Sequence, residues 1–250
     1  MSKRILLALL IAIPSLSLAK PKMVPLPESA AAALSGKTVA VTRHDKAGFS
    51  AMTAGKAAFG LFGAGAMIAA GNKIVDDNAI ADPADIIERE LVPAVAKHYG
   101  LKLKEGASPV IKASKPKEIA ATQPDVDYVI DVESTGWMFA YYPTDWDKYW
   151  IGYGAHVTLI DRASGKAIAD AFCNANTNKH AASPSKDSML ENNAQLLKDV
   201  TAAQGWACVH LLAKDEFRLP EGAATPVPAE FADPLTAYAQ KKSGGPASTN

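Results

Sequence analysis

The sequence has few of the residues on which enzyme and metal-site motifs depend. It contains two cysteines and five histidines, with no Cys-x-x-Cys pair and no H-E-x-x-H segment, so zinc-site spacing is lacking. It also lacks the G-x-S-x-G turn that presents a nucleophilic serine. A Ser-x-x-Lys tetrapeptide occurs twice, at 114–117 and 183–186, without the other elements of penicillin-binding enzymes. We therefore predict no catalytic residue, no metal site and no cofactor, and expect a protein that is not an enzyme.

An excess of charge of either sign is also lacking. Lys and Arg total 26, and Asp and Glu total 26. Proteins that bind nucleic acid present a basic surface, and anionic lipids attract clusters of Lys and Arg. Neither feature is found, so nucleic acid is excluded as an expected partner.

Hydrophobic runs long enough to span a membrane are lacking too, and the run at the start is short. Lys3 and Arg4 precede the apolar stretch Ile5–Ile13, and Ser17 and Ala19 place small residues at a cleavage site. This pattern predicts a signal peptide over residues 1–19, cleaved after Ala19. An uncleaved anchor is the alternative. No cysteine follows the cleavage site, so the usual lipid anchor is not expected. The mature protein is predicted to be periplasmic or secreted.

The two cysteines, Cys173 and Cys208, both remain after this cleavage. Paired thiols are normally oxidised in exported proteins. Cys173 follows a strand pattern and Cys208 lies on the apolar face of a predicted helix, so the sequence predicts a disulfide between them.

A segment without charge occurs inside the chain. From Ala57 to Gly71 no residue has a polar side chain, and glycine and alanine dominate. Small residues let helices approach closely. One interpretation is a tightly packed helical hairpin over the sheet, and the other is contact with a membrane through Ala57–Gly71.

The remaining elements predict an α+β fold, a single two-layer sandwich with a mixed, mostly antiparallel sheet and helices on one face. Alternating residues predict a strand over Val126–Met138 with a wet face, paired with Tyr153–Ile160 and turning at Ala163–Gly165 into Ala167–Phe172. Asp82 and Gly100 bound one helix. A second helix runs from about Met189 to Leu212, with Ser188 and Glu191 as its capping box.

Composition divides the chain into four parts. Residues 1–19 are the signal peptide, and residues 20–36 are a lead-in linker in which Glu28–Leu34 form one or two helical turns. Residues 37–218 form one domain, with the Gly/Ala-rich insert at 47–75. Residues 219–250 are rich in Pro, Ala, Gly and Ser, which predicts a disordered tail.

Aromatic residues gather in the stretch 137–153, which is predicted to include a connecting loop. Loops run over the surface and usually avoid such side chains. The loop either completes the core, or forms a patch that binds a protein, or stacks on sugar rings of a cell-wall glycan. The candidate binding residues are Trp137, Tyr141, Tyr142, Trp146 and Trp150.

One acid–base pair is expected across two strands. Pairing of 126–138 with 151–162 around a turn near Asp145 would bring Glu133 close to His156, with Asp131 and Thr158 on the same face. A carboxylate that orients an imidazole is a catalytic arrangement, and it is also a common cross-strand ion pair. The alternative function is therefore a cell-wall-acting hydrolase that uses Glu133 and His156.

The opening strand Gly36–Val41, the helix Asp82–Tyr99, the strand Asp127–Val132 and the hairpin Val157–Cys173 with its closing helix form one pattern. It resembles the small α/β domains of bacterial envelope accessory proteins, such as the TolB N-terminal domain and those of curli-secretion-type and transport-auxiliary lipoproteins. The resemblance is topological and implies an envelope location, but a fold alone does not transfer a function. We expect an exported, non-enzymatic envelope protein that binds a protein or cell-wall component. A membrane-inserting or pore-associated protein is a further alternative, and the sequence does not predict an oligomeric state.

Overall fold

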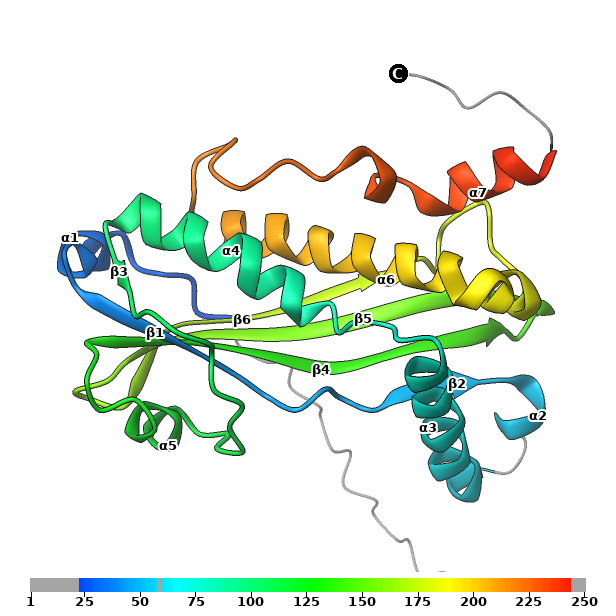
Figure 1. Ribbon diagram of the computed structural model, residues 1–250, viewed down its shortest axis with the longest axis horizontal. Helices are drawn as coiled ribbons and strands as arrows, with labels where there is room; N and C mark the ends of the chain where they lie inside the picture. The colour runs from blue at the N-terminus through cyan, green and yellow to red at the C-terminus, as the bar shows by residue number, and fades with distance from the viewer. Residues whose placement is uncertain (1–22, 58–59, 244–250) are drawn as a thin grey trace, which may run out of the picture.

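The computed structural model describes residues 23–57 and 60–243 (Figure 1), so the predicted signal peptide lies outside the described residues. The strands are β1 (Thr38–Arg43), β2 (Phe49–Met52), β3 (Lys102–Leu103), β4 (Tyr128–Tyr142), β5 (Asp145–Asp161) and β6 (Lys166–Asn176). The helices are α1 (Ala31–Leu34), α2 (Ala54–Ala57), α3 (Gly60–Asp77), α4 (Ala84–Tyr99), α5 (Pro116–Ala121), α6 (Lys186–Asp215) and α7 (Pro234–Ser243), with 3-10 turns η1 (Glu28–Ala30) and η2 (Ala229–Phe231).

The sheet is mixed, with the strand order β3-β1-β4-β5-β6. β1 runs parallel to β3 and to the first half of β4, and β2 runs parallel to the second half of β4. The long strands β4, β5 and β6 are antiparallel neighbours. The predicted α+β class, the mostly antiparallel sheet and the turn at Gly165, whose φ is +64°, are confirmed.

Helices α4 and α6 lie side by side on one face of the sheet (Figure 1). Leu91 of α4 and Val209 of α6 are fully buried in the main core, together with Ile151 and Val157 of β5. The predicted bounds of α4 are confirmed. Asp82 accepts a hydrogen bond of 2.9 Å from the Ala84 amide, and Gly100 ends the helix in the left-handed conformation, which glycine adopts without steric cost.

The sequence predicts that the opposite face of the sheet is exposed to solvent, but part of this face is buried. Short helix α5 covers one end of it, where Ile119, Val129 and Ile160 form a second apolar cluster. Asp131, predicted to face solvent, is 3% exposed. The apolar Val129 shares the face of Asp131 and packs in the cluster of α5, and Asp131 itself hydrogen-bonds with Thr42 and His44.

Helix α6 begins earlier than the sequence predicts, and the predicted capping box is wrong. Ser185, not Ser188, caps it and accepts a hydrogen bond from the Ser188 amide. Glu191 has an extended backbone, and Asn192–Ala194 have positive φ. These residues interrupt the helix between its first turn and the long helical segment that follows. Asparagine tolerates the left-handed conformation better than most residues. The periodicity of apolar residues does not report this backbone preference, so the interruption was not predicted.

The Gly/Ala-rich segment is helical in α2 and α3, as predicted, at one end of the sheet (Figure 1). Its first part, Phe49–Met52, was not predicted to be a strand but forms β2, which pairs with β4. Gly71 lets α3 approach β2 closely, because a Cβ there would lie 1.9 Å from the Phe49 carbonyl oxygen. Within residues 23–57 and 60–243, no helix has the length and apolar character needed to cross a membrane.

The two ends of the described chain belong to the folded unit. The lead-in contains the expected helical turns, but Val24 exchanges two backbone hydrogen bonds with Asp170, and Leu26 is 1% exposed. Residues 219–243, predicted to be disordered, include α7, whose Leu235 is buried against the core. Most residues of this segment are small or polar, which is why disorder was predicted. A few apolar side chains, spaced along the segment, are enough to dock it on the core.

Candidate binding site at the distal end of the β4–β5 hairpin

The aromatic stretch is not a loop but the distal half of the β4–β5 hairpin, and its side chains divide between the faces. Trp137, a predicted binding residue, is 2% exposed. Its Nε1 donates to the Ala47 carbonyl at 2.7 Å, and its ring packs edge to face on Phe49. Tyr149 and Tyr153 are also buried. For these residues the core interpretation is correct, and they are unavailable to a partner.

The other four predicted residues lie at three separate places. Trp146 is at the hairpin tip and is 66% exposed. Tyr142 is half-buried beside a cavity at the same end. Tyr141 packs against the main core, and Trp150 faces the other side of the sheet. Tyr142 and Trp146 therefore lie at the same end of the hairpin, although only Tyr142 lines the cavity, and Trp137, Tyr141 and Trp150 lie elsewhere.

The cavity beside Tyr142, called the distal pocket below, has a volume of about 750 Å3 and lies between the hairpin, the loop before α6 and α7. The Tyr142 hydroxyl donates to the Asn178 carbonyl at 3.0 Å and accepts from the Ser183 hydroxyl at 3.3 Å. These bonds hold the loop against the hairpin. The loop before α6 and the segment that carries α7 were not among the predicted site residues, because neither has a motif.

The charged side chains that line the distal pocket are mainly basic. Lys148, Lys179 and Lys242 line it with a single carboxylate, that of Asp145. His180 is held by Asp233, whose carboxylate lies 3.1 Å from its Nε2. Burial by itself would raise the Asp233 pKa, but hydrogen bonds from Thr236 and the neighbouring His180 lower it overall. The pocket can therefore attract an anionic group, and the exposed Trp146 ring can stack on a sugar or an apolar surface.

The pair considered for catalysis, Glu133 and His156, is found in the predicted cross-strand register. The His156 Nδ1 is 4.0 Å from Glu133, whereas its Nε2 is 2.5 Å from Asp170 of β6. The imidazole also stacks on Phe172, with ring centroids 4.0 Å apart. His156 does not line the distal pocket. The arrangement links three strands, and Asp170 was missed because the register of β6 depends on a bulge at Leu159/Ile160.

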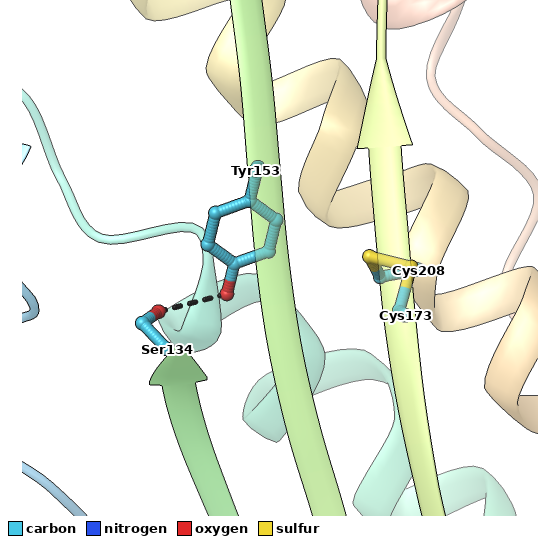
Figure 2. The surroundings of a disulfide bond; sticks show 4 residues. All are labelled: Ser134, Tyr153, Cys173 and Cys208. Atoms are coloured by element: carbon cyan, nitrogen blue, oxygen red, sulfur yellow. Dashed lines mark hydrogen bonds between the residues drawn. A yellow bond between two sulfur atoms is a disulfide. The ribbon is translucent and has the colours of Figure 1, made fainter. Parts of the chain in front are cut away.

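Two buried clusters of hydrogen-bonded polar side chains were not predicted. Thr42 and His44 both hydrogen-bond Asp131. Under α4, the Ser134 hydroxyl contacts Tyr153 and the helix-capping Asp82 (Figure 2 shows Ser134 and Tyr153).

Burial raises the pKa of Asp82 and that of Tyr153 above their ordinary values. Asp82 thus accepts a hydrogen bond from a free amide at the start of α4 and, through Ser134, links this helix to β4.

No group of three potential metal ligands occurs in the described part of the chain.

The predicted disulfide between Cys173 and Cys208 is confirmed (Figure 2). The Cα atoms are 5.5 Å apart, and both residues are buried in the main core. The bond fixes the C-terminal part of α6 to β6. It is chemically suited to an oxidising compartment, as was argued from the sequence.

Comparison with known proteins does not assign the chain to a family. No family model matches it, and no curated protein matches it. It is similar to the crystal structure of lipoprotein GNA1162 from Neisseria meningitidis, with 11% identity and a TM-score of 0.31 over 72% of this chain and 99% of that chain. It is also similar to the PelC dodecamer from Paraburkholderia phytofirmans, with 13% identity and a TM-score of 0.30 over 80% and 97%. At these TM-scores, neither similarity carries a functional argument.

Proposed function

We propose that this protein is exported and acts in the cell envelope as a non-enzymatic binding protein, with the hairpin tip and distal pocket as its binding site. The observation that carries the proposal is Trp146, a large aromatic side chain that is 66% exposed at the end of the β4–β5 hairpin. Tryptophan is one of the residue types most enriched among the residues that supply the energy of binding interfaces. The signal-peptide pattern and the cysteine pair support export.

The ligand proposed is an anionic cell-wall glycan. The Trp146 indole offers a flat face for a sugar ring at the hairpin tip. Lys148 and Lys179 line the distal pocket at the same end of the hairpin and can bind carboxylate or phosphate groups. Lysine binds such groups as a point charge. Because these lysines are exposed, salt screens their attraction, so binding weakens as ionic strength rises.

The test is co-sedimentation of the mature protein with insoluble peptidoglycan. Trp146→Ala is expected to weaken binding by roughly tenfold or more, the usual effect of removing an interface anchor. Leu103→Ala is the matched control, because Leu103 is 41% exposed on β3, far along the sheet from the hairpin tip. Both variants should melt at nearly the wild-type temperature. Equal binding by wild type and Trp146→Ala would refute the site, and release of soluble glycan fragments would show an enzyme instead.

A further inference from the structure

The sheet face that α4 and α6 leave uncovered has an apolar groove beside α3. Its volume is about 600 Å3, within the range of small-ligand sites. Its walls and floor include Met52, Met67, Ile68, Met138, Trp150 and Gly152. We call it the α3 groove. It lies on the other side of the sheet from α6, and the residues that line it are separate from those of the distal pocket.

Glycine determines the shape of the floor. A Cβ at Gly152 would lie 2.8 Å from the Trp150 ring, so the absence of a side chain lets the indole lie across the strand. At Gly154 the corresponding space is taken by polar side chains, because a Cβ there would lie 2.6 Å from the Thr135 hydroxyl and 3.3 Å from the Asn174 side-chain oxygen. The two glycines therefore let the Trp150 ring and the side chains of Thr135 and Asn174 lie close against the strand at the floor of the groove.

The lining is neutral and mostly apolar, with a few hydroxyl and amide side chains. None of the described residues that line the groove has a charged side chain, although the chain as a whole is 21% charged. Ile68 is 44% exposed, and Met52, Met67 and Met138 supply unbranched thioethers. Methionine side chains adapt to irregular apolar partners. Asn174 and Asn176 add neutral hydrogen-bonding groups.

We propose that the α3 groove binds one acyl chain of an envelope lipid. A flexible hydrocarbon chain carries no charge and needs no hydrogen-bonding partner, which matches a lining of methionine, isoleucine and tryptophan. The groove has the volume of a site for a single small ligand. A stable protein interface is a much larger surface, about 800 Å2 on each partner. Asn174 and Asn176 can hydrogen-bond a neutral ester or hydroxyl group. This site does not depend on the distal pocket.

The probe for the test is N-phenyl-1-naphthylamine, a neutral dye that fluoresces in apolar sites, displaced by hexadecanol. The wild-type mature protein is expected to bind the dye and release it to hexadecanol. Ile68→Glu places a charge at the exposed wall of the groove and should weaken binding at least tenfold. Val110→Glu is the matched control, because Val110 is 54% exposed and is not among the residues that line the groove, and it should bind as wild type does.

Three results would overturn the proposal. The first is that the wild type binds neither probe. The second is that Ile68→Glu keeps wild-type affinity while remaining folded. The third is a wild-type dimer in sedimentation that Ile68→Glu converts to monomer, which would make the groove an interface between two copies. Trp146→Ala should leave dye binding unchanged, so that failure at one site is distinguishable from failure at the other.

Discussion

At the scale of single residues, Glu216 at the end of α6 is a carboxylic acid in an unfavourable place. It is 0% exposed, and neither carboxyl oxygen has a hydrogen-bond partner among the described residues. Burial, with a smaller contribution from the negative charge of Asp170, raises the Glu216 pKa well above its ordinary value. The folded state therefore binds this proton more tightly than the unfolded state does.

The sign of the effect on stability follows from this difference. Below the ordinary pKa of glutamate, Glu216 is protonated in both the folded and the unfolded state. As pH rises above that pKa, the unfolded state gains stability by ionising Glu216, so the free energy of unfolding falls. We predict that Glu216→Gln raises the free energy of unfolding at pH 7 by about 1 kcal/mol or more, since each pKa unit is worth about 1.4 kcal/mol. The gain should shrink as pH falls to about 4.5, the ordinary glutamate range.

Urea denaturation at the two pH values measures this difference. Glu221→Gln is the control, because Glu221 is exposed in the segment after α6, and it should change stability at neither pH. A Glu216→Gln protein that is less stable than wild type at pH 7 would contradict the assignment of a buried neutral acid.

The residue scale is also where prediction from sequence was weakest. Strand alternation puts Tyr128, Ile130 and Val132 on the core face, and continuing it would have placed Met138 there. A β-bulge between Ser134 and Gly136 inserts one residue and turns Trp137 to the core instead. Bulges reverse the facing of every later side chain. The isolated Gly136 was the sequence signal for it.

At the scale of elements, the end of α3 contains a local conflict between residue and conformation. Ala79 follows the helix with φ of +50°, and the Ile80 amide hydrogen-bonds the Val75 carbonyl at 3.0 Å. Helices commonly end this way with glycine, because a Cβ in the left-handed conformation costs about 1–2 kcal/mol.

We therefore predict that Ala79→Gly stabilises the protein by a few tenths to about 1 kcal/mol, the relief of strain less the extra entropy of the unfolded chain. Ala66→Gly, at an exposed position inside the same helix, should destabilise it by about 0.5–1 kcal/mol. Thermal and urea unfolding of the two variants measure both signs. Destabilisation by both substitutions would show that Ala79 is not strained.

Elements with local signals were predicted well. The bounds of α4 follow from Asp82 and Gly100, and the β4–β5–β6 meander follows from alternation and the turn at Gly165. The parallel pairing of β1 with β4 and the docking of α7 join residues far apart in the chain. No local pattern encodes them, so they were not predicted.

At the scale of the whole molecule, the two candidate sites lie in different parts of one fold. The Cys173–Cys208 bond and the α4–α6 layer hold one face of the sheet. The hairpin tip with its basic pocket and the uncharged α3 groove are left available. The two proposed sites, for an anionic glycan and for an apolar chain, therefore have separate linings.

The central claim, that the distal end of the hairpin binds a cell-wall glycan without cleaving it, is tested most directly by amide hydrogen exchange with soluble peptidoglycan fragments. We predict slowed exchange in residues 142–148 and 178–185, with the fragments recovered intact. Protection that is absent from these two segments, or fragments that return shortened, would contradict the claim.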